Sequence, residues 1–136
     1  MSFETTVAVR YDDIDSYGHV NNVRYGTYLE EARIDYLDEV VSSETGVLDA
    51  DGDSGIVIKT LEIEYERPLR GTDHVTVGVR IPELGTTSFP IEYAVRDGER
   101  VVASAETTVV TFDRGAGEPH PIPDAWRDAI TEFEEL

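Results

Sequence analysis

The sequence predicts an α+β protein in which one long helix packs against an antiparallel sheet. Apolar residues recur at spacings of three and four over about 22–41, and alternating apolar residues fill runs on both sides of this segment. A single apolar stripe needs one broad sheet to pack on, and antiparallel strands around the helix satisfy both elements. The 136 residues fit one domain, 1–136, with a C-terminal tail over 114–136.

The first half of the chain supplies one strand and the long helix. Residues 5–11 have the composition of a strand, and a polar loop over 12–18 follows. Asn21 or Asn22 can cap the helix, which at about 20 residues would be about 30 Å long. Its apolar stripe consists of Tyr25, Tyr28, Leu29, Ala32, Tyr36 and Val40. A connector over 42–54 is rich in Asp, Ser and Gly.

Four strands in hairpin succession are expected after the connector. Their ranges are 55–67, 74–81, 86–96 and 100–112. Pro68 ends the first of them, and Asp97-Gly98 is a strong hairpin signal between the last two. Pro123 is expected at the first position of a short helix that reaches Glu134. One helix cannot cover five strands, so we expect a homodimer or homotetramer that uses the remaining edge or face.

The charge balance is strongly acidic. The chain has 29 Asp and Glu against 11 Lys and Arg, a formal net charge of −18. Such a surface repels nucleic acid and anionic membranes, so neither is an expected partner. Two interpretations explain the acidity. The protein could bind a basic or metal ligand, or its whole surface could be adapted to a salty cytoplasm. Because the acidic residues are scattered along the chain, we favour the second interpretation, a halophilic source. At about 1 M salt the Debye length is only ~3 Å, so the repulsion between these acidic residues becomes tolerable.

The residue types present also exclude several kinds of site. The chain has no cysteine, which removes disulfides, thiolate zinc sites and cysteine nucleophiles. The three histidines, His19, His74 and His120, lack ligand spacing, so no metal site and no cofactor are expected. No apolar run is long enough to span a bilayer, and the N-terminal residues lack the features of a signal peptide. We therefore expect a cytoplasmic protein.

The densest polar cluster lies between Tyr11 and Tyr25, where the first strand leads into the long helix. It holds three aspartates, one histidine and two asparagines. The start of a helix offers unpaired backbone N–H groups and partial positive charge, which can hold a developing oxyanion. A carboxylate just before them can act as a nucleophile or as a general base for water. These are the two requirements of acyl transfer.

The order of residues in this cluster matches a known pattern. It reads Tyr11, Asp13-Ile14-Asp15-Ser16-Tyr17-Gly18, Asn22, Tyr25 and Glu30-Glu31-Ala32-Arg33. This stretch resembles the hotdog-fold thioesterases of the 4-hydroxybenzoyl-CoA thioesterase type, which show D-x-D-x-x-G followed by N-x-x-Y-like and E-x-A-R-like steps. The set of Asp15, His19, Asn21-Asn22 and Tyr25 also looks like acyl-carrier-protein thioesterases, and 65–73 is similar to the family's segment between its second and third strands.

The resemblance implies a hotdog fold, a five-stranded antiparallel sheet wrapped around a central helix, with active sites at a dimer interface. It implies hydrolysis of acyl-CoA thioesters without metal or cofactor. Asp15 would be the catalytic carboxylate, and a backbone N–H near Asn22 would be the oxyanion donor. Several bacterial members carry histidine where this chain has Asn22, which leaves His19 as a catalytic partner or a substrate-orienting group.

Simpler interpretations stand beside these roles. Asp15 is also a common type of turn residue, and His19 a solvated one. Asn21 and Asn22 can be caps, substrate contacts or both. Tyr25 fits the core and can also line the site.

Arg67 and Arg70, and separately the adjacent pair Asp12-Asp13, also have more than one interpretation. Arg67 and Arg70 could clamp the phosphates of coenzyme A, or could balance nearby acids. Asp12 and Asp13 fit turn or solvent-facing carboxylates better than catalysts. The rival functions are a hotdog dehydratase or hydratase and a non-catalytic acyl-thioester-binding module.

Overall fold

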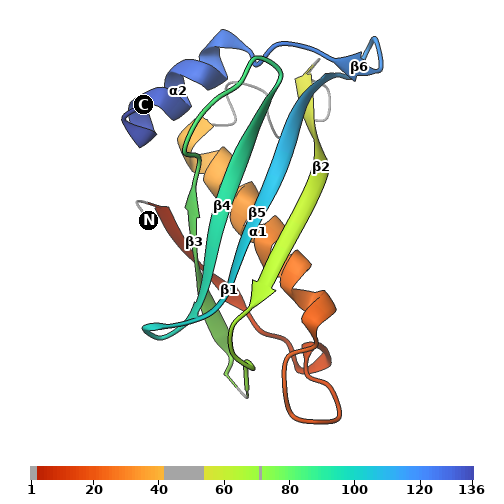
Figure 1. Ribbon diagram of the computed structural model, residues 1–136, viewed down its shortest axis with the longest axis vertical. Coiled ribbons are helices and arrows are strands. Elements are labelled where there is room, and N and C mark those ends of the chain that lie inside the picture. The colour runs from red at the N-terminus through yellow and green to blue at the C-terminus, as the bar shows by residue number, and fades with distance from the viewer. Residues whose placement is uncertain (1–2, 42–53, 71) are drawn as a thin grey trace.

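An antiparallel sheet curls around one long helix (Figure 1). The computed structural model describes residues 3–41, 54–70 and 72–136. The strands are β1 (Phe3–Ala8), β2 (Ser54–Tyr65), β3 (His74–Arg80), β4 (Ser88–Asp97), β5 (Arg100–Asp113) and β6 (Glu118–Pro119). The sheet order is β1-β3-β4-β5-β2, and the two-residue β6 pairs with the end of β5. The predicted α+β hotdog architecture is confirmed, with β6 as an addition within the predicted tail.

The predicted hairpin succession of four strands is wrong at its first step. β2 does not pair with β3 but lies beyond β5, with Leu61 opposite Thr107. The hairpins β3–β4 and β4–β5 do form. The physical reason is the connection over 66–73, which contains Pro68 and is too long for a tight turn. Its described residues, 66–70 and 72–73, lie at the end of the sheet between the edge strand β2 and the inner strand β3 (Figure 1).

The long helix has three continuous parts. A 3-10 turn over Asn22–Arg24 leads into α1 (Tyr25–Tyr36), which ends in a π-helical turn over Leu37–Val41. The predicted stripe is buried against the sheet from Tyr25 to Tyr36, and Val40 is half-buried. The spacing of the apolar residues thus predicted the buried face correctly. Part of the predicted connector, 42–53, lies outside the described residues.

The C-terminal helix α2 (Asp124–Glu134) covers the end of the core that lies away from the polar loop (Figure 1). Trp126 and Ile130 are buried, and Pro123 occupies the cap position rather than the predicted first helical position. One carboxylate oxygen of Glu134 accepts hydrogen bonds from the Tyr36 hydroxyl at 2.6 Å and from the Ile81 N–H at 2.9 Å. These bonds join α2 to α1 and to the end of β3.

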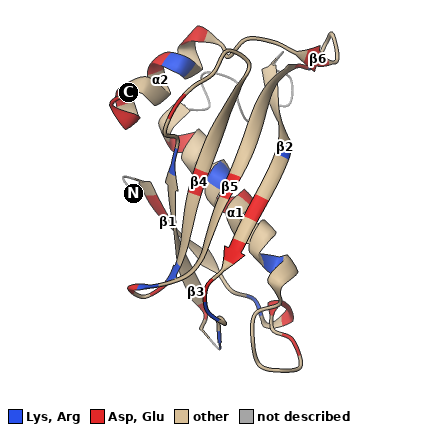
Figure 2. Ribbon diagram, in the orientation of Figure 1, with Lys and Arg blue, Asp and Glu red and all other residues tan. Residues whose placement is uncertain are grey.

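The acidic residues are spread over both helices, the strands and the loops (Figure 2). This distribution agrees with the scatter seen along the sequence. No helix in the described part of the chain is long and apolar enough to cross a membrane.

Candidate active site

Asp15 lies in a tight loop that the backbone closes on itself. Its Oδ1 atom accepts hydrogen bonds from the N–H groups of Tyr17 at 2.9 Å and His19 at 3.3 Å. The Asp15 N–H donates to the His19 carbonyl at 2.8 Å, and Gly18, at φ 80°, makes the reversal possible. Among the described residues Oδ2 has no hydrogen-bond partner. One carboxylate oxygen is therefore held in place while the other stays available.

Asp13 anchors this loop beneath the helix. Its side chain is buried, and its Oδ2 atom accepts from the Tyr28 hydroxyl at 2.8 Å and from the Arg10 N–H at 2.9 Å. Arg24 lies 3.7 Å from Oδ1. The prediction of a turn or solvent-facing carboxylate is half right, because Asp13 does end a 3-10 turn but faces inward. Burial, followed by the bond to Asp13, raises the pKa of the Tyr28 hydroxyl above its usual value.

The helix start presents one open donor. The Asn21 side chain accepts from the Val23 N–H at 3.1 Å, which confirms its predicted capping role. The N–H groups of Arg24 and Tyr25 bond to the carbonyls of Asn21 and Asn22. Within the described chain this leaves the Asn22 N–H without an acceptor.

The end of β2 and the residues after it form the opposite wall. The Tyr65 hydroxyl donates to the Asn22 carbonyl at 3.0 Å, and its ring meets the ring of Tyr25 edge-on at 5.1 Å. Glu66 and Arg67 both direct their N–H groups at the Val102 carbonyl. Residues 65–67 are thereby fixed against both the helix start and β5.

A cleft of about 450 Å³ opens between these two walls. Of the residues selected from the sequence, Asp15, His19, Asn21, Asn22, Tyr25 and Arg67 line it. Tyr25 is almost fully buried and still borders the cleft, so it belongs both to the core and to the site. Burial, followed by the neighbouring Tyr65, raises the pKa of the Tyr25 hydroxyl.

Arg70 does not line this cleft. It borders an adjoining hollow of about 280 Å³, which shares Arg67 and Pro68 with the cleft. The backbone of Arg70 forms an isolated β-bridge with His19, which borders the cleft.

No group of three histidine, aspartate or glutamate side chains within residues 3–41, 54–70 and 72–136 is arranged to hold a metal. Of the histidines, His74 contacts Asp73 at 2.7 Å, and His120 lies 3.3 Å from the Ser54 hydroxyl. Only His19 borders the cleft.

Comparison with known proteins assigns the chain to a family. The family model described as the thioesterase-like superfamily matches residues 9–130, which include both walls of the cleft. The chain belongs to the thioesterase-like superfamily. This confirms the resemblance to hotdog thioesterases that the order of residues from Tyr11 to Arg33 indicated.

Several proteins that are similar to this chain have names or solved structures. The long-chain acyl-CoA thioesterase FadM of Escherichia coli (strain K12) is 32% identical over 113 residues, which are 81% of this chain and 83% of that protein. The acyl-CoA thioesterase YbgC of Haemophilus influenzae is 26% identical over 89% of this chain and 88% of its own length. A thioesterase from Thermus thermophilus, crystallised with coenzyme A and Zn, is 32% identical with a TM-score of 0.82, covering 99% of this chain and 96% of that one.

Three residues that build this thioesterase-like site were not among the site residues selected from the sequence. Tyr65 and Glu66 line the cleft, and Asp13 fixes the loop that carries Asp15. Tyr65 ends an alternating strand and precedes Pro68, which is a signal for a strand end but not for a contact with the helix. That contact depends on β2 lying at the sheet edge beside the helix start, which the local sequence does not encode.

Proposed function

We propose that this chain hydrolyses acyl-CoA thioesters to a free acid and coenzyme A. The observation that carries the proposal is the shared cleft, which is lined both by Asp15, whose Oδ2 atom has no partner among the described residues, and by Asn22, whose N–H has none. A carbonyl carbon between a carboxylate and an oxyanion donor can undergo attack while its oxygen is stabilised. The names of the relatives FadM and YbgC support the same substrate class.

In the proposed reaction the thioester carbonyl oxygen lies at the Asn22 N–H. In one route Asp15 removes a proton from water, the hydroxide attacks the carbonyl carbon, and the thiolate leaves and takes the proton from Asp15. In the other route Asp15 attacks directly, the thiolate leaves with a proton from water, and water then cleaves the mixed anhydride and frees Asp15. His19 and the Asn22 side chain orient the carbonyl or the water, and Asn21 and Tyr25 contact the substrate.

The decisive test is Asp15→Asn, with Asp12→Asn as the matched control. Both changes remove one negative charge from the same loop, and Asp12 is exposed and outside the cleft. Turnover should be measured as thiol release from a panel of acyl-CoA esters in molar KCl. We expect Asp15→Asn to lose at least about 10²-fold, since general-base groups contribute typically 10²–10⁴-fold, while Asp12→Asn stays near wild type.

The outcomes separate the rival functions. Wild-type turnover in Asp15→Asn, with unchanged unfolding, would remove Asp15 from the mechanism. Tight binding of acyl-CoA by the wild type without thiol release would favour a binding module. Consumption of an enoyl-CoA without thiol release would favour a hydratase.

We also propose that two copies of the chain pair at β2. β2 is one of the two edge strands of the sheet, and large apolar side chains are exposed on β2 and on the segment that leads into α1: Leu61 at 50%, Tyr65 at 45%, Val23 at 75% and Tyr17 at 84%. An unpaired edge with apolar neighbours favours association with another chain. Light scattering after gel filtration in molar KCl measures the state, and a monomer at assay concentration would refute the dimer. The cytoplasmic location stays a prediction.

A further inference from the structure

Three arginines at one end of the molecule make no ion pair within the described residues. They are Arg67, Arg70 and Arg100, and all three are exposed. Four other arginines of this acidic chain do have a carboxylate partner, namely Arg10, Arg24, Arg80 and Arg96. With 29 acidic residues available, cations that stay unpaired and lie together are a distinctive feature.

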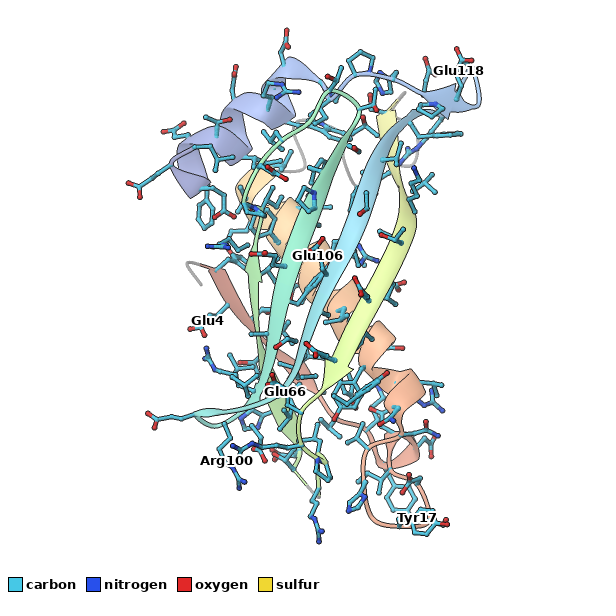
Figure 3. All side chains as sticks on the ribbon, in the orientation of Figure 1. Glu4, Tyr17, Glu66, Arg100, Glu106 and Glu118 are labelled. Carbon is cyan, nitrogen blue, oxygen red and sulfur yellow. The ribbon has the colours of Figure 1, made fainter. Side chains whose placement is uncertain are left out.

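The fold brings these arginines together from two segments far apart in the sequence. Arg67 and Arg70 come from the chain between β2 and β3, and Arg100 begins β5 after the Asp97-Gly98 turn. All three border the hollow of about 280 Å³, together with Asp97. Figure 3 shows Arg100 at the same end of the molecule as Glu66, which belongs to the cleft.

The hollow is positioned rigidly relative to the cleft. The N–H groups of Glu66 and Arg67 bond to the Val102 carbonyl at 2.9 and 3.2 Å, which fixes them to β5 close to Arg100. The Val20 N–H bonds to the Leu69 carbonyl at 2.7 Å, which joins the same segment to the loop of Asp15. A ligand that extends from the cleft past Arg67 therefore enters the hollow.

We propose that Arg100, with Arg67 and Arg70, binds the phosphate groups at the nucleotide end of a coenzyme A thioester. The inference rests on the function proposed above and adds Arg100 as a residue that determines specificity. With Asp97 counted, the hollow keeps two excess positive charges, and guanidinium groups hold phosphate oxygens in bidentate geometry. In a chain of net charge −18, an anionic substrate needs such a local reversal of sign.

The test is Arg100→Gln, with Arg114→Gln as the control. Arg114 follows the other end of the 14-residue strand β5, so it lies roughly 40 Å away, while its loss changes the net charge equally. That distance is several Debye lengths even at 0.1 M salt, so a general charge effect is screened. Arg100→Lys is the rescue variant, because it keeps the charge.

Each variant should be assayed with three thioesters of one acyl group: coenzyme A, phosphopantetheine and N-acetylcysteamine. The KCl concentration should be the lowest at which the protein stays folded. For Arg100→Gln we expect KM for the coenzyme A ester to rise roughly fivefold, as for an exposed charge pair worth close to 1 kcal/mol, with kcat unchanged. Both shorter esters should be unaffected, and Arg114→Gln should match wild type on all three.

An equal rise for the phosphopantetheine ester would overturn the assignment to the nucleotide, because carrier proteins share that single phosphate. An unchanged KM in Arg100→Gln, or an equal change on all three esters, would also overturn it. Calorimetric titration with adenosine 3′,5′-bisphosphate tests the site without turnover, and its Kd should rise by a similar factor in Arg100→Gln. If wild type hydrolyses no ester but binds this nucleotide through Arg100, the proposed function fails and the phosphate site stands.

Discussion

Removal of the Tyr28 hydroxyl should destabilise the protein, because this hydroxyl is part of the buried anchor beneath the Asp15 loop. Tyr28 is fully buried, Asp13 is 5% exposed, and the two side chains share a hydrogen bond of 2.8 Å. A hydrogen bond to a charged group contributes about 1.5–3 kcal/mol, and its loss leaves a buried carboxylate with fewer donors. We therefore expect Tyr28→Phe to lower the free energy of unfolding by about 1.5–3 kcal/mol.

Tyr25→Phe is the matched control for this measurement. It deletes the same atom from the neighbouring turn of α1, and the Tyr25 hydroxyl makes no hydrogen bond to the described residues. Urea unfolding at one fixed KCl concentration gives both the midpoint and the slope, so a change in stability can be separated from a change in the unfolded state. Tyr25→Phe should lie within about 0.5 kcal/mol of wild type. Equal losses in the two variants would refute a specific role for the Tyr28–Asp13 bond.

Two further predictions concern pH and salt. Burial and the hydrogen bond to Glu134 raise the pKa of the Tyr36 hydroxyl above its ordinary 10.0. As the pH rises, the unfolded chain therefore loses this proton before the folded chain does. The contribution of Tyr36 to stability is fully present below about pH 10 and is lost above it. Tyr36→Phe should reduce the alkaline slope of unfolding free energy by about 1.4 kcal/mol per pH unit, and an unchanged slope would contradict this. On the outer face of the sheet Glu106 stands directly opposite Glu62 on β2 and Glu92 on β4, so like charges repel each other there. Glu106→Gln should therefore raise the free energy of unfolding by about 0.5–1 kcal/mol at low KCl, and by much less in molar KCl, where salt screens the repulsion. Glu64→Gln is the control, because Glu64 is exposed in the same β2–β5 pairing but lies opposite the uncharged Ser104. A wild-type protein that gains no stability from KCl would argue against a halophilic source.

The fold was predictable wherever a local period carried the information. The apolar stripe of α1 and the alternation in β3, β4 and β5 each reflect one buried face, so their existence and direction follow from the residues alone. The placement of β2 did not follow, because the chain order alone does not set which strand lies beside it. The bulge between Ile58 and Thr60 was also beyond local patterns, since it is a property of the β2–β5 register.

The site was predictable where its parts are neighbours in sequence. Asp15, His19 and the helix start lie within one short stretch, and the structure brings them into one cleft. Tyr65 and Arg100 come from distant strands, and their places depend on sheet order. The pairing of Arg67 with Arg70 was visible from Pro68-Leu69 between them, but Arg100 could join them only after the β4–β5 hairpin was placed.

Asp13 and Asp15 illustrate why residue type alone did not separate a buried anchor from a residue that lines the cleft. They are two residues apart in the same motif, yet one is buried beneath α1 and the other borders the cleft. The Tyr28 hydroxyl and the Arg10 N–H hold the Asp13 side chain, and the Asp13 carbonyl accepts from the Asn21 N–H at 2.8 Å. The same residue therefore fixes the strand end, the loop and the helix start relative to one another. The proposed reaction needs Oδ2 of Asp15 and the Asn22 N–H at a set separation, and on that proposal the first aspartate of the motif holds the second one in position.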